Sequence, residues 1–334
     1  MNQASTSSIR RKRLYIVLTV LVVFIIFGVF AYRFCAQAVQ AERHARYVGI
    51  MTVTSERIAY MIRSMEMNAM NEFDEVQKHL DSPESVIAAL HSKTSLNPEV
   101  RGYFAAFEPN YFPQKGQWFE PYVHHVDNNA FEVRDVGSAN HNYHKSEWYI
   151  RAKKSKDSFW SDPYYYNDGT AISGHYTTFV KPIFNEKGQL ACVCGADMTF
   201  EWLAKELERI TYLTKNGSLL NRYVDDTDFY TVVINNSDGS CIVSPEGKDV
   251  SFTEEYLKRE LAEKNRGTVD MEIDGIPSTV YYRPIERVDW TIAVVVPLQG
   301  VEHPLVTLVI ILLIVAILGI LVVWFISKPV FAKL

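Results

Sequence analysis

The residues best suited to bind a small molecule gather in residues 148–197, which are rich in Trp and Tyr and contain several carboxylates. Aromatic side chains of these types supply flat apolar walls, and their polar ends take part in hydrogen bonds. With one upstream tyrosine included, the expected ligand contacts are Tyr122, Trp148, Tyr149, Tyr164, Tyr166 and Asp197. Because the chain contains 19 Tyr, the alternative for any one of them is ordinary packing between strands.

Asp197 is the acidic member of this set, and it lies at the end of an apolar segment that is expected to form a strand. A carboxylate in such surroundings needs a partner. A ligand cation held over aromatic faces would supply one, at about 0.5–2 kcal/mol for each good cation–π contact. The alternative is that Asp197 caps the helix expected after it, because Asp is a favoured N-cap residue. The sequence leaves both interpretations open.

Residue patterns typical of catalysis or of metal binding are missing. The sequence contains no P-loop, no GxGxxG and no nucleophile elbow. The neighbours His124 and His125 would point to opposite faces of a strand, and no HExxH or CxxC spacing accompanies them or the histidines at 141, 144 and 175. We therefore expect no catalytic residue, no metal and no cofactor in these residues.

Composition narrows the class of protein further. At 334 residues the chain is longer than one ordinary domain, and it is globular in character, with 48% hydrophobic residues. Its net charge of −5 and the lack of a basic stripe argue against nucleic-acid binding. Cys192 and Cys194 fall on one face of an expected strand, where neighbours are poorly placed to form a disulfide, so buried thiols are expected.

Two apolar segments predict a two-pass membrane protein. Residues 14–32 carry no charge and follow the basic run at 10–13, which places residues 1–13 in the cytoplasm. A cleaved signal peptide is the alternative, but its apolar core usually has only about 7–15 residues. Residues 305–326 form the second span, so residues 33–304 are expected outside the cytoplasm and residues 327–334 inside it.

Residues 33–80 are expected to form a long helix, because they contain no Pro and place apolar residues at helical spacing. The helix should break at Asp81-Ser82-Pro83, before a short second helix within 84–91. A methionine-rich stripe in the long helix favours a packing face, in a core or a dimer, over a binding groove. We assign residues 33–92 to this helical region.

Alternating segments after the helices predict two α+β units in tandem, at residues 93–213 and 214–304. The first has strands at 101–107 and 118–126, a hairpin at 177–184 and 189–196, and a helix at 201–213. Pro121 suggests an edge strand or a bulge. The second unit has strands at 229–234, 240–243, 268–273, 276–285 and 290–296, and a helix at 253–263. A weak repeat links them, since Val-Lys-Pro-Ile at 180–183 parallels Tyr-Arg-Pro-Ile at 282–285.

Several longer motifs occur in order between the two apolar segments: FEPNYFP at 107–113, EPYV at 120–123, SEWY at 146–149, WSDPYY at 160–165, GADMTFEWL at 195–203 and DWTIAVVVP at 289–297. In these motifs the chain resembles the double Cache family, the extracytoplasmic sensors of bacterial transmembrane receptors. The resemblance implies two PAS-like units, membrane-distal and membrane-proximal, with the ligand in the distal one. We assign Trp160 and Pro163 to structural roles. Ser327-Lys328-Pro329 resembles the start of a HAMP linker.

Within that family an amino-acid-binding subgroup has an Arg two residues before the Trp-Tyr pair and an Asp two residues after the later Tyr. This chain has Ser146 and Tyr166 at these positions. Loss of the Arg removes the bidentate fork for a ligand carboxylate, and Lys145 or Arg151 would not restore that geometry. The positions that match are Trp148, Tyr149, Tyr164 and Asp197, so the resemblance implies that Asp197 holds a ligand ammonium group.

These observations together predict the sensor region of a receptor in a bacterial inner membrane. We expect a homodimer that binds an amine, an amino-acid-like molecule or a carboxylate in the distal unit. The signal would pass through the second span to a cytoplasmic output domain after residue 334. The alternative is a membrane-anchored interaction module that binds a partner protein or a cell-wall polymer.

Overall fold

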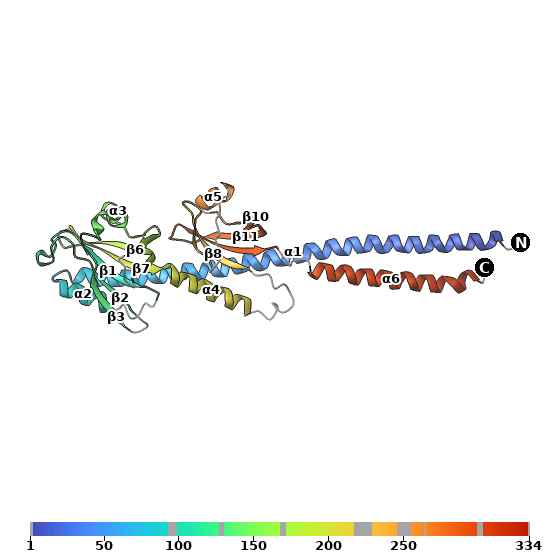
Figure 1. Ribbon diagram of the computed structural model, residues 1–334, viewed down its shortest axis with the longest axis horizontal. Coiled ribbons are helices and arrows are strands. Elements are labelled where there is room, and N and C mark those ends of the chain that lie inside the picture. Colours follow the sequence, from blue (N-terminus) through green and yellow to red (C-terminus); the bar gives the residue numbers. More distant parts are fainter. Residues whose placement is uncertain are drawn as a thin grey trace. The chain divides into compact units, whose positions relative to one another are not determined.

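The computed structural model of the chain describes residues 3–92, 99–126, 130–167, 172–216, 229–245, 255–263, 265–298 and 303–332 (Figure 1). Helix α1 (Gln3–Lys78) is continuous, and α2 (Pro83–Ser92) follows it after a short turn. The Ser82 hydroxyl accepts a hydrogen bond from the Ser85 N–H at 3.1 Å. Pro83 is the first residue of α2, a position at which a backbone N–H would have no partner within the helix, so the lack of an N–H in proline costs nothing there. The predicted break between the two helices is confirmed.

Two of the described helices are long and apolar enough to cross a membrane. They are α1, in its N-terminal part, and α6 (His303–Ala332), whose candidate span is Leu305–Ile326. Gly319 lets the two approach closely, because a Cβ there would lie 2.5 Å from the ring of Phe24. Residues 3–49 of α1 and helix α6 belong to one compact unit, and residues 50–78 of α1 belong with both sheets to the other.

The first sheet has seven strands in the described residues, in the order β3-β2-β1-β7-β6-β4, with β5 also paired to β6. Their bounds are β1 (Gly102–Phe107), β2 (Pro121–His125), β3 (Phe131–Asp135), β4 (Phe159–Trp160), β5 (Tyr164–Tyr166), β6 (Gly174–Phe184) and β7 (Leu190–Thr199). The pairs are antiparallel. Helix α3 (Glu147–Ser155), helix α4 (Phe200–Asn216) and the 3-10 helices Pro113–Lys115 and Tyr143–Lys145 complete this part.

This sheet corrects one sequence prediction and adds three strands. Strand β2 lies between β3 and β1, so the prediction of an edge strand from Pro121 is wrong; Pro121 is its first residue, where a missing N–H is tolerated. Strands β3, β4 and β5 were not predicted. The hairpin of β6 and β7 is confirmed, with Gly188 at φ +72° in its turn.

The second sheet has five strands in the described residues, in the order β10-β11-β12-β8-β9. They are β8 (Tyr230–Asn235), β9 (Cys241–Val243), β10 (Gly267–Ile273), β11 (Ile276–Pro284) and β12 (Trp290–Pro297), with helix α5 (Glu255–Ala262) before β10. Asp274 and Gly275 both have positive φ, as a two-residue hairpin turn requires. The predicted strands of this sheet are confirmed.

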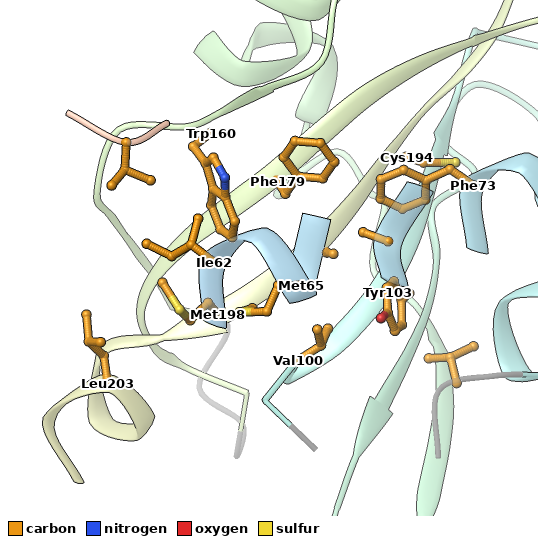
Figure 2. Packing of buried hydrophobic residues seen from close by; sticks show 14 of the residues in the cluster. Ile62, Met65, Phe73, Val100, Tyr103, Trp160, Phe179, Cys194, Met198 and Leu203 are labelled. Atoms are coloured by element: carbon orange, nitrogen blue, oxygen red, sulfur yellow. The ribbon is translucent and has the colours of Figure 1, made fainter. Parts of the chain in front are cut away.

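Helix α1 forms the core with one face of both sheets. Figure 2 shows Ile62, Met65 and Phe73 of α1 packed against side chains of the first sheet, among them Phe179 and Met198. The same cluster continues into the second sheet through Val233, Ile285, Trp290 and Ile292. Of the methionine stripe, Met51 and Met65 are buried and Met61 and Met70 pack against this core, whereas Met67 is 66% exposed. The interpretation as a packing face is therefore correct for four of the five methionines.

Each sheet also has an ion pair to α1 at the repeated sequence motif. Lys181 Nζ lies 2.7 Å from Asp74 Oδ1, and Arg283 Nη2 lies 2.6 Å from Glu56 Oε1. The two acids are 18 residues apart in the sequence, which is about five turns of an α-helix and puts them on the same side of α1. The weak repeat therefore marks equivalent points of attachment.

Candidate ligand-binding site

A small cavity lies on the face of the first sheet opposite to α1. Its volume is ≈ 40 Å³, and its lining residues are Phe104, Glu120, Tyr122, Val136, His141, Trp148, Tyr164, Tyr166, Ile172, Tyr176 and Asp197. An open cleft of ≈ 830 Å³ shares Val136, His141, Trp148, Tyr164 and Tyr166 with it. We call these the inner cavity and the outer cleft. The inner cavity is large enough for a few waters or one small polar head group, and the outer cleft leaves room for the rest of a ligand.

Two glycines allow aromatic rings to form the floor of the inner cavity. Phe104 of β1 pairs with Gly195 of β7, and a Cβ on Gly195 would collide with the Phe104 ring. A Cβ on Gly102 would lie 2.7 Å from the Tyr122 ring in the same way. Side chains alternate between the two faces of a strand. The strand neighbours of these glycines and aromatic residues therefore point to the other face of the sheet, towards α1. The floor is therefore built from neighbouring strands that the sheet order brings together.

Asp197 of β7 is the acidic group on this floor, and 7% of its surface is exposed. Thr178 Oγ1 donates a hydrogen bond to Asp197 Oδ1 at 2.6 Å, and the Tyr164 hydroxyl lies 3.5 Å from the same oxygen. Burial raises the pKa of Asp197 to about 7; the hydrogen bond from Thr178 opposes this rise, and the nearby charge of Glu120 adds to it. Asp197 is thus poised between its neutral and charged forms near neutral pH.

The alternative role of Asp197 as a helix cap is wrong. Asp197 lies inside β7, whose last residue is Thr199, and α4 begins at Phe200. The side chain that meets the first turn is that of Thr199, because its Oγ1 accepts the Trp202 N–H at 3.2 Å. The carboxylate of Asp197 is left facing the inner cavity.

A second acid, Glu120, lines the same cavity and is 2% exposed. Its Oε2 lies 3.2 Å from Nε2 of His141, which also lines the cavity. Burial raises the pKa of Glu120, and the neighbouring His141 opposes that rise. The inner cavity therefore holds two buried carboxyl groups, and among its described lining residues His141 is the one with a basic side chain.

The walls are aromatic, and their hydroxyl groups are neutral. Trp148 of α3 packs on Phe104 with ring centroids 5.1 Å apart, and Tyr164 stacks on Tyr176 at 6.1 Å. Burial raises the pKa of Tyr122 and of Tyr164 well above the usual range. These phenols stay protonated, so they can donate hydrogen bonds to a carboxylate or accept one from a ligand.

The structure brings together five of the six expected contacts: Tyr122, Trp148, Tyr164, Tyr166 and Asp197 line the inner cavity. The sixth expected contact, Tyr149, lies elsewhere. Tyr149 does not line the cavity, because it follows Trp148 on α3 and points to another side of the helix. Its hydroxyl donates to Glu108 Oε1 at 2.7 Å, and Lys153 binds the same carboxylate.

Sequence reasoning missed Glu120, His141 and Tyr176. Glu120 precedes Tyr122 by two residues, the spacing that places strand side chains on one face, so that signal was available. Of the two substitutes considered for the absent Arg, Arg151 lines the outer cleft, whereas Lys145 lines neither space. The Arg151 guanidinium lies 4.1 Å from the Phe159 ring centroid, which occupies it in a cation–π contact.

Residues 86–205 match the first PDC sensor domain of methyl-accepting chemotaxis protein-like receptors. The fold is that of a Cache-type sensor domain. Among solved structures, one similar fold is the extracellular domain of mmHK1S-Z3, which is assigned to the histidine kinases. Its TM-score is 0.62 at 19% sequence identity, and the alignment covers 79% of this chain and 97% of the mmHK1S-Z3 chain. The periplasmic sensory domain of the Campylobacter jejuni chemoreceptor Tlp1 has a TM-score of 0.61 at 14% identity, with coverages of 77% and 95%.

The Cache-type fold is also found in a chemoreceptor with a bound amino acid. The ligand-binding domain of Pseudomonas fluorescens CtaA, in complex with L-serine, has a TM-score of 0.52 at 15% identity and covers 77% of this chain and 98% of its own. No curated protein sequence matches the chain. Residues 86–205 thus match a sensor-domain family, and the described chain also has two helices long and apolar enough to cross a membrane.

Proposed function

We propose that this chain is the sensor region of a two-pass receptor in a bacterial inner membrane, and that its first sheet binds a small molecule through an ammonium group at Asp197. The observation that carries the proposal is a buried acid, 7% exposed, in a cavity walled by aromatic rings and neutral hydroxyl groups. A buried carboxylate is costly unless it is paired. A ligand ammonium group would pair with it, donate up to three hydrogen bonds and lie against the aromatic faces.

The two acids that line the inner cavity favour an amine over an α-amino acid, and the nearby cation, Arg101, already interacts with Tyr122 and Tyr176. In an α-amino acid bound through Asp197, the carboxylate would lie next to the ammonium and therefore close to Glu120 in the same cavity. Two like charges in such surroundings repel strongly. Arg134, on the outer cleft, is already bonded to Glu132 at 2.8 Å, and Ser146 stands where the amino-acid-binding subgroup has its Arg. A simple carboxylate ligand is disfavoured for the same reason.

The two connected spaces suggest how such a ligand lies. The inner cavity, at ≈ 40 Å³, accommodates the ammonium head, and the outer cleft accommodates the remainder. Trp148, Tyr164 and Tyr166 belong to both linings, so movement of these side chains accompanies entry of the ligand. The signal then passes through the second sheet and α6 to a cytoplasmic output domain, within a homodimer. A ligand drives this change only as far as its affinities for the two conformations differ.

Matched pairs of compounds test the proposal on the full chain in detergent. Ethanolamine is compared with L-serine, and 3-methylbutylamine with L-leucine, because the members of each pair differ by one carboxylate. We expect one or both amines to raise the melting temperature more than the paired amino acid, and Asp197→Asn to remove the effect. Glu186→Gln is the matched control, since it removes one exposed acid that lines neither the inner cavity nor the outer cleft and should leave the shifts unchanged.

Three outcomes would count against it. Shifts that survive in Asp197→Asn would remove Asp197 from the site. A stronger response to the amino acids would overturn the preference for amines. No response to any of the four compounds, in protein shown to be folded, would favour a partner protein or a cell-wall polymer as the ligand.

A further inference from the structure

Glu66 of α1 joins the two sheets through one carboxylate. Trp160 Nε1, at the end of β4, donates a hydrogen bond to Glu66 Oε1 at 2.9 Å, and this bond is buried. Arg287, in the turn between β11 and β12, places Nη1 3.0 Å from Glu66 Oε2. The Glu66 side chain is 11% exposed. Each oxygen of one buried carboxylate is therefore bonded to a different sheet.

The partner in the first sheet is connected to the ligand site by an unbroken series of bonds. Ser161 follows Trp160, and its N–H donates to Thr178 O at 2.9 Å. The Thr178 N–H donates in return to Ser161 Oγ at 3.0 Å, and Thr178 Oγ1 donates to Asp197 Oδ1 at 2.6 Å. A change of charge or position at Asp197 thus acts on the residues next to Trp160.

The partner in the second sheet is a strained position. Arg287 has φ +76°, a left-handed conformation that is unfavourable for a residue with a Cβ. Such a conformation persists only when its surroundings hold it. The ion pair with Glu66 is one of these constraints, so loss of that contact lets the β11–β12 turn relax.

The space around Glu66 leaves room for movement. A cleft of ≈ 1130 Å³ is lined by Glu66, Trp160 and Arg287 together with Asp162, Trp290 and others. In close-packed protein, side chains on opposite sides of a contact cannot shift independently. Here the sheets meet beside an open space, so the bonds to Glu66 can lengthen or exchange partners without a clash.

We propose that Glu66 is a positioning residue that couples the ligand site of the first sheet to the β11–β12 turn of the second sheet. This inference rests on the proposed function for its physiological meaning, because it gives the route by which occupancy of the Asp197 site is reported. A change at Asp197 moves Trp160, the Trp160–Glu66 bond changes, and Arg287 and its turn respond. By thermodynamic reciprocity, a change at Arg287 alters the ligand site to the same extent.

Hydrogen–deuterium exchange on the full chain tests the coupling without a ligand. Asp197→Asn is the perturbation at the site, and backbone exchange of residues 284–290 is the readout. We expect Asp197→Asn to change that exchange at least about twofold, the lower end of measured couplings. The same substitution in a Glu66→Gln background should have no effect on it, because the ion pair to Arg287 is lost. Trp160→Phe, which keeps the ring and removes the donor, should act like Glu66→Gln.

Glu286→Gln is the matched control. Glu286 lies beside Arg287 and bonds Arg63 of α1 at 3.4 Å, but it has no bond to the first sheet among the described contacts. In this background the effect of Asp197→Asn should persist. An effect of equal size with and without Glu66, or no effect in the otherwise wild-type chain, would overturn the proposal. Failure of the amines to bind while the coupling persists would instead overturn only the proposed ligand.

Discussion

Replacing Asp197 with Asn should stabilise the ligand-free protein above neutral pH, even though it replaces a hydrogen-bonded carboxyl group. The pKa of Asp197 is raised from 3.8 to about 7 by burial. A carboxyl group with a raised pKa binds protons in the folded state more tightly than in the unfolded state, so stability is lost as pH rises from about 4 to about 7. At pH 8 the folded protein carries the full cost of a buried charge.

The magnitude follows from the difference between the two pKa values. Each pKa unit corresponds to about 1.4 kcal/mol, so a rise from 3.8 to about 7 places an upper limit of about 4 kcal/mol on the cost. Asn keeps the shape and can still accept the hydrogen bond from Thr178. We expect about half of that limit to appear as a gain, or a melting temperature higher by several degrees at pH 8 and little changed at pH 4.

The assay is thermal unfolding of both proteins in detergent at pH 4, 6 and 8, followed by tryptophan fluorescence. The wild-type chain should lose stability across this range relative to Asp197→Asn. Glu147→Gln, which removes an exposed acid, should follow the wild type. A melting temperature for Asp197→Asn below that of the wild type at pH 8 would refute the reasoning, because it would show that the charged form is stabilised by the fold.

Three further predictions concern the same site. An amine should bind about tenfold more weakly at pH 6 than at pH 8, since the charged fraction of Asp197 falls by about that factor; isothermal titration with ethanolamine measures it, and equal affinities would argue against the ion pair. Thr178→Val should weaken amine binding by about tenfold in the same titration, because it removes a hydrogen bond to a charged group. Gly195→Ala should lower the stability of the chain by about 1–3 kcal/mol in thermal unfolding, because its Cβ meets the Phe104 ring, whereas Gly188→Asn, in an open turn, should be tolerated.

The sequence predicted the parts of the fold that have strong local signals. Turn residues such as Asp274-Gly275 and the Ser82-Pro83 break mark chain reversals by their own conformational preferences. Strand β3 escaped prediction because its residues, Phe131–Asp135, are largely charged and half-exposed, and they become a strand by pairing with β2. Strands β4 and β5 have two and three residues and exist only as partners of β6.

The same distinction applies to the candidate site. Trp148, Tyr164 and Asp197 lie in motifs that stand out in the sequence, and the structure brings them to one cavity. Glu120 immediately precedes β2 and Tyr176 lies in β6, and these strands are not adjacent in the sequence. Their proximity depends on the order of strands in the sheet, which no local pattern encodes. Whether these residues bind a ligand remains a prediction.

The two ion pairs that attach the sheets to α1 limit how this protein can change in length. Glu56 and Asp74 are separated by 18 residues, and each residue of an α-helix advances its face by about 100°. Loss or gain of a single residue between them would rotate one docking acid away from its basic partner and turn one sheet to another side of the helix. Insertions that keep both sheets in phase are restricted to near-whole numbers of turns. In engineered hybrids, a sheet from another sensor should therefore be exchanged with its own turns of helix.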